Sequence, residues 1–251
     1  MKIAIIHDWL VTMRGGEKVL EALCEAYPSA DLYTIYCDKN QISQKIRNMN
    51  IIPSFIQRLP FANRNFRLYL PLFPLAVEKF NLKSYDLIIS VSHCVAKGII
   101  PVNGAFHVCY CNAPMRYVWD FQDEYLGKLK SNLFTGKLIR ALIKYLKNWD
   151  ERTCPRVHAF IANSRNIAGK IKNTNAGIIL MLIFAACSSA RCLLLVRMLS
   201  AKTLKDCATL VPNRSVWIRT ATKAFRSSTL VRLPRLRNAS ARFLPALTSR
   251  L

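Results

Sequence analysis

Short apolar runs alternate along much of the chain with segments in which apolar residues recur every three or four positions. The apolar run at residues 3–6 predicts a strand covered on both faces, and the recurrence from Glu17 to Tyr27 predicts a helix. Further strands are expected at 30–37, 50–56, 85–93, 105–112 and 156–164, and further helices at 40–48, within 66–82, at 131–153 and from 165 onward. Strands that alternate with helices and are apolar throughout indicate an α/β fold, a parallel sheet with helices on both faces.

Polar residues fall where several of these strands end. These positions are Asp8, Gly15, Gly16, Ser92, His93, Asn112, Asn163 and Ser164. Because the carboxyl ends of parallel strands meet at one edge of a sheet, and ligands of such sheets bind there, we expect these residues to form one site.

The glycine pair lies between the first strand and the helix that follows it. Glycines lack Cβ atoms, so they let the backbone N–H groups of a helix N-terminus come close to an anion, which the helix dipole also favours. A tight turn between a strand and a helix uses glycine for another reason, its conformational freedom. The sequence leaves both interpretations of Gly15 and Gly16 open.

Four blocks within residues 1–174 together resemble a known family. They read IHDWLVTMRGGEKVLEAL, YDLIISVSHCVAKGI, CYCNAPMRYVWD and FIANSRNIAGKI. In order and spacing they are similar to the amino-terminal domain of family 4 glycosyltransferases, in particular the bacterial mannosyltransferase-like group that builds cell-surface polysaccharides. The resemblance implies the first half of a GT-B fold, in which two Rossmann-like domains face each other across the active-site cleft.

The resemblance also implies a reaction. Family members are retaining glycosyltransferases, and the sugar transferred here is expected to be mannose or a similar hexose. It would pass from a nucleotide-sugar donor to a cell-surface polysaccharide or lipid-linked acceptor, with no metal ion and no cofactor. The family's first domain mainly holds the acceptor. We therefore expect an enzyme of polysaccharide biosynthesis in the cytoplasm, peripheral to the inner face of the cell membrane.

Carried over position by position, the resemblance assigns roles to the glycine pair, His93 and Asn112. Gly15 and Gly16 would face the donor phosphate and the reacting sugar, where fixed N–H dipoles stabilise the charge on the leaving diphosphate. His93 would be a catalytic residue that hydrogen-bonds a sugar hydroxyl, and a core histidine is the alternative. Asn112, the second expected catalytic residue, stands where the family usually has histidine. Its amide can hydrogen-bond the transferred sugar but cannot take up a proton near neutral pH.

Four more residues complete the expected site. Arg116 and Tyr117 would contact acceptor or phosphate groups, or would instead anchor their own segment. Asn163 and Ser164 are the other expected substrate-binding residues. Ser164 is also expected to cap the helix that begins after it.

The resemblance ends where the composition changes, near residue 176. The formal net charge of the whole chain is +23, and residues 176–251 contain one acidic residue, Asp206. The glycine loops, the Arg/Lys pair and the paired glutamates expected of a donor domain are missing from this stretch. We therefore interpret residues 1–174 as the family domain and residues 175–251 as a basic tail, translated out of frame or disordered. We expect this truncated chain to be inactive as a transferase.

A second interpretation takes the basic tail at face value. The chain would then be a non-catalytic protein that binds an acceptor, or a basic protein that contacts polyanions or a membrane. Nucleic acid is not an expected partner, because the arginines of the tail are spread among aliphatic residues, with only three aromatic side chains (Phe184, Trp217 and Phe225) before Phe243. The nine cysteines follow no zinc or disulfide spacing and indicate a reducing compartment.

Residues 137–149 are the predicted contact with an anionic membrane. Helical spacing places Lys137, Arg140, Lys144 and Lys147 on one face and Leu138, Leu142, Tyr145 and Trp149 on another. A basic face beside an aromatic-tipped apolar face suits the cytoplasmic leaflet, and it equally suits a surface helix packed on its own sheet. The longest apolar stretch, residues 176–190, is too short for a comfortable membrane span.

Overall fold

The structure, a computed structural model, describes residues 1–102, 104–119, 133–172 and 178–181. For residues 116–117, 133–135 and 178–181 it describes the backbone alone. The chain divides into two compact units, Met1–Ala201 and Lys202–Leu251. All described residues belong to the first unit, and the predicted basic tail lies outside them except for 178–181.

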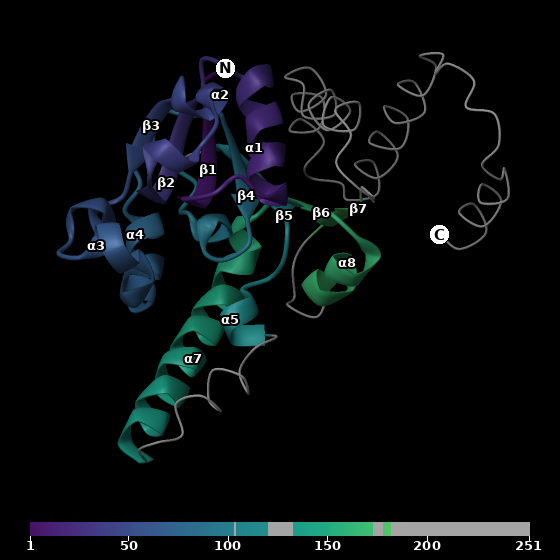
Figure 1. Cartoon of the computed structure of the whole chain (residues 1–251). Coiled ribbons are helices and arrows are strands. Elements are labelled where there is room, and N and C mark those ends of the chain that lie inside the picture. The colour runs from purple at the N-terminus through teal and green to yellow at the C-terminus, as the bar shows by residue number, and fades with distance from the viewer. Residues whose placement is uncertain (103, 120–132, 173–177, 182–251) are drawn as a thin grey trace, which may run out of the picture. The chain divides into compact units, whose positions relative to one another are not determined.

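A parallel sheet runs through the described part of the chain (Figure 1), which confirms the predicted Rossmann-like α/β fold. It has seven strands in the order β3-β2-β1-β4-β5-β6-β7, and every neighbouring pair is parallel. The strands are β1 (Ile3–Leu10), β2 (Asp31–Cys37), β3 (Asn50–Pro53), β4 (Leu87–Ser92), β5 (Phe106–Cys111), β6 (Ala159–Ala162) and β7 (Ile178–Met181).

Helices connect the strands. The α-helices are α1 (Gly15–Ala26), α2 (Gln44–Arg47), α3 (Ala62–Asn65), α4 (Phe73–Glu78), α5 (Arg116–Trp119), α7 (Leu133–Thr153) and α8 (Arg165–Lys172). Short 3₁₀ helices are η1 (Lys39–Gln41), η2 (Phe55–Arg58), η3 (Phe66–Leu72), η4 (Ala96–Gly98) and η5 (Cys154–Arg156). In the described part of the chain, no helix is both long enough and apolar enough to cross a bilayer.

Two of the predicted elements are shorter than expected. The helix expected at 40–48 is divided, because the Ser43 hydroxyl accepts the Ile46 N–H and starts α2 anew. The strand expected at 50–56 ends at Pro53, which has no N–H to donate to a ladder. The Ser54 hydroxyl then accepts the Ile56 N–H and starts η2.

The seventh strand was not predicted. β7 lies beyond residue 174 and pairs with β6 in parallel, from Ala159 beside Ile178 to Ala162 beside Met181. The sheet therefore continues past the expected domain boundary by one short strand.

The strand order reverses between β1 and β4. Since parallel crossovers are right-handed, α1 and α2 cover one face of the sheet, and α4, α7 and α8 cover the other (Figure 1). Such a reversal opens a crevice at the carboxyl ends of the two strands beside it, where ligands of doubly wound sheets bind.

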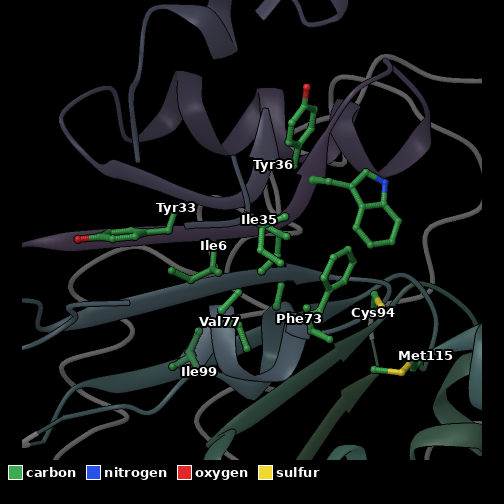
Figure 2. Packing of buried hydrophobic residues seen from close by; sticks show 14 of the residues in the cluster. Ile6, Tyr33, Ile35, Tyr36, Phe73, Val77, Cys94, Ile99 and Met115 are labelled. Atoms are coloured by element: carbon green, nitrogen blue, oxygen red, sulfur yellow. The ribbon is translucent and has the colours of Figure 1, made fainter. Parts of the chain in front are cut away.

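One apolar cluster joins the central strands to the helices packed on them. Figure 2 shows Phe73 and Val77 of α4 in the same packed layer as Ile6 of β1 and Ile35 of β2. Each of these residues is at most 1 % exposed. Burying large side chains to this degree stabilises the fold by about 1.5–3 kcal/mol per side chain.

A buried polar network attaches α7 to the end of β4. The Lys97 ammonium lies 2.9 Å from the Asp150 carboxylate and donates to the Asp150 carbonyl. Burial lowers the pKa of Lys97 more than any single neighbour raises it. The charge of Asp150, the neighbouring Cys154 and Cys109, and the hydrogen bond to Asp150 together outweigh burial, so the pKa of Lys97 lies above its usual value. The Trp119 indole also donates to Asp150. Asp150 thus fixes the C-terminal half of α7.

Candidate functional site

The candidate site lies at the carboxyl edge of the sheet, around the reversal between β1 and β4. Asp8 belongs to β1 itself, and the glycine pair opens α1 after it. His93 follows β4, and Asn112 follows β5. The structure therefore brings the predicted strand-end residues to one edge, as the parallel fold requires.

Asp8 organises the turn after β4. Its side chain is fully buried and accepts four backbone N–H groups, from His93 and Cys94 at one oxygen (2.6 and 2.9 Å) and from Val95 and Ala96 at the other (2.6 and 2.7 Å). Sequence analysis placed Asp8 after the first strand. It lies within β1 instead, and its carboxylate reaches the turn after β4. Four charge-assisted hydrogen bonds fix the backbone that carries His93.

The His93 ring is held from two sides. Its Nδ1 lies 3.0 Å from the Asp8 carboxylate, and its ring meets Trp9 edge to face with centroids 4.4 Å apart. The side chain is 20 % exposed. Because Asp8 accepts at Nδ1, a neutral ring carries its proton there and presents a lone pair at Nε2. His93 is therefore an oriented, partly accessible histidine and not a core residue.

The glycine pair forms the first turn of α1. A Cβ placed on Gly15 would meet no described atom within 4 Å, and one on Gly16 would lie 3.0 Å from Asn112 Nδ2. Neither glycine has a positive φ, which among the described residues occurs only at Gly104 and Phe61. The backbone conformation therefore does not require glycine at either position, and the tight-turn explanation fails. At Gly16 the Asn112 side chain itself comes close, and no described atom comes close to Gly15.

Glu17 caps the same helix. Its carboxylate accepts the Arg14 N–H at 3.0 Å, and the residue is 5 % exposed. An acidic side chain in the first turn also suits the helix dipole. Glu17 is thus occupied as a helix starter, and the N–H groups of the first turn have no intrahelical acceptor.

Asn112 and Asn163 lie side by side at the ends of β5 and β6. Asn163 Nδ2 donates to the Asn112 carbonyl at 2.9 Å. Asn112 Nδ2 and Asn163 Oδ1 are buried without a hydrogen-bond partner among the described residues. Leaving a buried polar atom unpaired is costly, so each atom is a candidate to bind a ligand group.

The remaining predicted site residues are placed differently. The Ser164 hydroxyl accepts the Ile167 N–H at 3.3 Å, which confirms the predicted helix cap and uses that oxygen. The backbones of Arg116 and Tyr117 belong to α5, and their side chains lie outside the described part of the chain.

Sequence analysis missed one functional-site neighbour, His7. It lies in the middle of β1, is 1 % exposed, and neither ring nitrogen has a hydrogen-bond partner among the described residues. Burial, reinforced by the neighbouring His93, lowers the pKa of His7 to about 4. No pattern pointed to it, because a single histidine inside an apolar run looks like part of a strand.

Acid is expected to destabilise the protein through His7 and His107. Burial lowers the pKa of His107 to about 3, and its ring is bonded to the Ser90 hydroxyl. Unfolded histidine takes up its proton near pH 6.5, whereas these two stay neutral in the folded state until about pH 4 or lower. Stability is therefore complete above pH 6.5 and is lost as pH falls toward 4. Each histidine is expected to contribute about 1.4 kcal/mol per pH unit near pH 5.

Urea unfolding of the whole chain at several pH values between 7 and 5 measures this loss. In a His7→Gln variant, the unfolding free energy should change with pH by about 1.4 kcal/mol per pH unit less than in the native chain, since the variant lacks one of the protons taken up on unfolding. An unchanged slope in that variant would show that His7 does not titrate between the two states.

The structure describes the side chains of six of the nine cysteines. Of these, Cys24, Cys37, Cys94, Cys109, Cys111 and Cys154, all are buried and free. No group of three or more histidine, cysteine, aspartate or glutamate side chains gathers as metal ligands would in these described segments.

The predicted apolar face of α7 is divided. Trp149 is 4 % exposed and packs in the core beside Leu142, while Leu138 is 65 % and Tyr145 43 % exposed. Packing on the protein's own sheet therefore accounts for the C-terminal half of that face.

Comparisons with known proteins add no identity. No family model, no curated protein and no solved structure matches the chain.

Proposed function

We propose that this chain is the acceptor-side part of a retaining glycosyltransferase that uses a nucleotide-sugar, a hexose donor such as guanosine-diphosphate mannose, and a glycan or lipid-linked acceptor. One observation carries the proposal. Gly15 and Gly16 begin α1 in conformations open to any residue, and the space in front of Gly15 is free of described atoms. The four sequence blocks that resemble family 4 glycosyltransferases support the same conclusion.

The chemistry of this helix terminus suits a phosphate. The N–H groups of the first turn and the helix dipole favour an anion, and the missing Cβ at Gly15 leaves room for it. Asn112 Nδ2 adds a buried donor close to Gly16. These donors would stabilise the negative charge that develops on a departing diphosphate.

His93 suits a sugar hydroxyl. Asp8 holds its Nδ1, so Nε2 of the neutral ring is an oriented acceptor for an O–H group. The partly exposed ring would position the acceptor or the transferred sugar, and the Asp8 contacts would keep that position fixed.

Placing a side chain on the helix terminus tests the phosphate site. Gly15→Val fills space that no described atom occupies, so it should leave the fold intact and lower the affinity for guanosine-diphosphate mannose at least about tenfold. Saturation-transfer NMR and calorimetric titration of the whole chain measure that affinity.

Gly169→Val is the matched control, because a Cβ at Gly169 also meets no described atom within 4 Å and lies in a helix away from the strand ends. The glycine pair would not belong to the site if the Gly15→Val variant bound guanosine-diphosphate mannose as tightly as the native chain. The same would follow if Gly15→Val and Gly169→Val lost equal affinity.

Turnover distinguishes an enzyme from a binding protein. The purified chain is mixed with labelled guanosine-diphosphate mannose and a lipid-linked acceptor extract. Acceptor or donor binding without product is expected, because the stretch after residue 176 lacks the residues of a donor domain. Product at an ordinary enzymatic rate would contradict the expected inactivity and support the transferase outright.

A further inference from the structure

Residues 58–79 present an apolar surface that nothing in the described chain covers. Four large side chains are exposed there: Phe61 by 69 %, Leu68 by 69 %, Leu72 by 38 % and Leu75 by 44 %. They come from the turn before α3, from η3 and from α4, which follow one another along the chain and contact one another. We call these residues the outer leucine surface.

The segment is apolar on two opposite sides. Phe66, Phe73 and Val77 point into the core and are at most 6 % exposed. Leu68, Leu72 and Leu75 recur at intervals of four and three residues and are exposed. A helical segment with apolar side chains on two opposite sides is normally covered on both, and no described residue covers the outward side.

Phe61 is held at this surface in an unfavourable backbone conformation. Its φ is 58°, the left-handed region that a bulky residue rarely adopts and that Asn or Gly fills more easily. The Tyr69 hydroxyl donates to the Pro60 carbonyl at 2.5 Å and holds this turn against η3. An exposed phenylalanine in a strained position does not serve the fold, which favours a role in binding.

The charges around the surface select its partner. Arg58, Arg64, Arg67 and Lys79 are all exposed. The one acidic residue between 58 and 79 is Glu78, which is paired with Arg156 at 2.7 Å and accepts the Trp149 indole N–H. A surface of exposed aliphatic and aromatic side chains among exposed cations complements an anionic bilayer surface.

We propose that the outer leucine surface docks the protein on an anionic lipid bilayer, with Phe61 and the three leucines entering the interface and the four basic residues contacting lipid phosphates. A second copy of the chain is a poorer occupant, since two such surfaces would bring eight cations together. This proposal stands on exposed side chains and does not depend on the glycosyltransferase proposal.

A tryptophan placed at the surface reports insertion directly. Phe61→Trp and Leu138→Trp replace two apolar side chains of similar exposure, one in the outer leucine surface and one in α7. Vesicles of phosphatidylcholine with phosphatidylglycerol brominated on its acyl chains are added to each whole-chain variant. The tryptophan at 61 should be quenched and its emission shifted to the blue, relative to the native chain. Quenching at 138 that equals or exceeds that at 61 would overturn the assignment, and so would an unquenched tryptophan at 61.

A second variant separates binding from folding. Phe61→Asn suits the left-handed backbone better, so the melting temperature should rise while vesicle affinity falls about tenfold. Salt is kept high enough to screen binding by the basic residues 182–251. Unchanged affinity would overturn the proposal. Light scattering of the native chain should show a monomer, and a dimer that Leu68→Ser dissociates would show instead that a second copy covers the surface.

Discussion

Replacing Asp8 with asparagine should destabilise the protein by about 3–5 kcal/mol, a large part of the stability of an ordinary domain. The carboxylate is fully buried and accepts four backbone N–H groups of residues 93–96 as well as Nδ1 of His93. An amide would turn an NH₂ group toward N–H donors and leave at least one of them unpaired. Urea unfolding of the whole chain at neutral pH measures the loss.

Asp38→Asn is the matched control. Asp38 follows β2 and accepts one backbone N–H, from Asn40 at 3.0 Å, which an asparagine oxygen can also do. This variant should stay within about 0.5 kcal/mol of the native chain. If Asp8→Asn cost no more than Asp38→Asn, the carboxylate would not be what holds the turn after β4.

The same buried carboxylate shows what the sequence could predict about the site. Parallel strands bring their carboxyl ends to one edge, so the positions of His93 and Asn112 followed from the alternation of strands and helices. The partnership of Asp8 with residues 93–96 did not follow, because it joins segments about 85 residues apart and depends on where a side chain points. Pattern analysis locates strand ends but not the hydrogen bonds between them.

The strands were the most predictable elements. β1, β2, β4 and β5 are buried on both faces and mostly apolar, and such runs leave little choice of structure. Two predicted boundaries were wrong because a single residue ends or restarts the element, namely the Ser43 cap and Pro53. β7 was not predicted, for another reason. Its four residues form a strand by pairing with β6, and a short apolar run carries no sign of a distant partner.

The structure also changes the interpretation of the glycine pair. From the sequence, a tight turn and an approach site were equal explanations. Ordinary backbone angles at Gly15 and Gly16 remove the first. The proposed phosphate site therefore depends on a fact that composition and spacing do not contain, namely the sign of φ at two residues.

Gly98→Ala is expected to destabilise the protein by about 3 kcal/mol, although it adds a single methyl group. A Cβ at Gly98 would overlap the ring of Trp149, which is 4 % exposed and whose indole donates to Glu78. The ring has little room to move, because α7 is fixed nearby by the Lys97–Asp150 pair. Thermal and urea unfolding of the whole chain measure the effect.

Gly169→Ala is the control for the added methyl group. The new methyl group meets no described atom within 4 Å and lies in α8. The variant should be neutral or stabilising by up to about 1 kcal/mol because alanine favours helix.

The overlap itself is tested by combining Gly98→Ala with Trp149→Leu. Trp149→Leu alone removes buried surface and the bond to Glu78, so it should also destabilise the fold. If the overlap is the cause, the double variant should lose about 1–3 kcal/mol less unfolding free energy than the two single variants lose in sum. The shorter leucine side chain leaves space for the methyl group. Additive losses would mean that Gly98 is required by its own backbone and that Trp149 could be packed against a larger residue there.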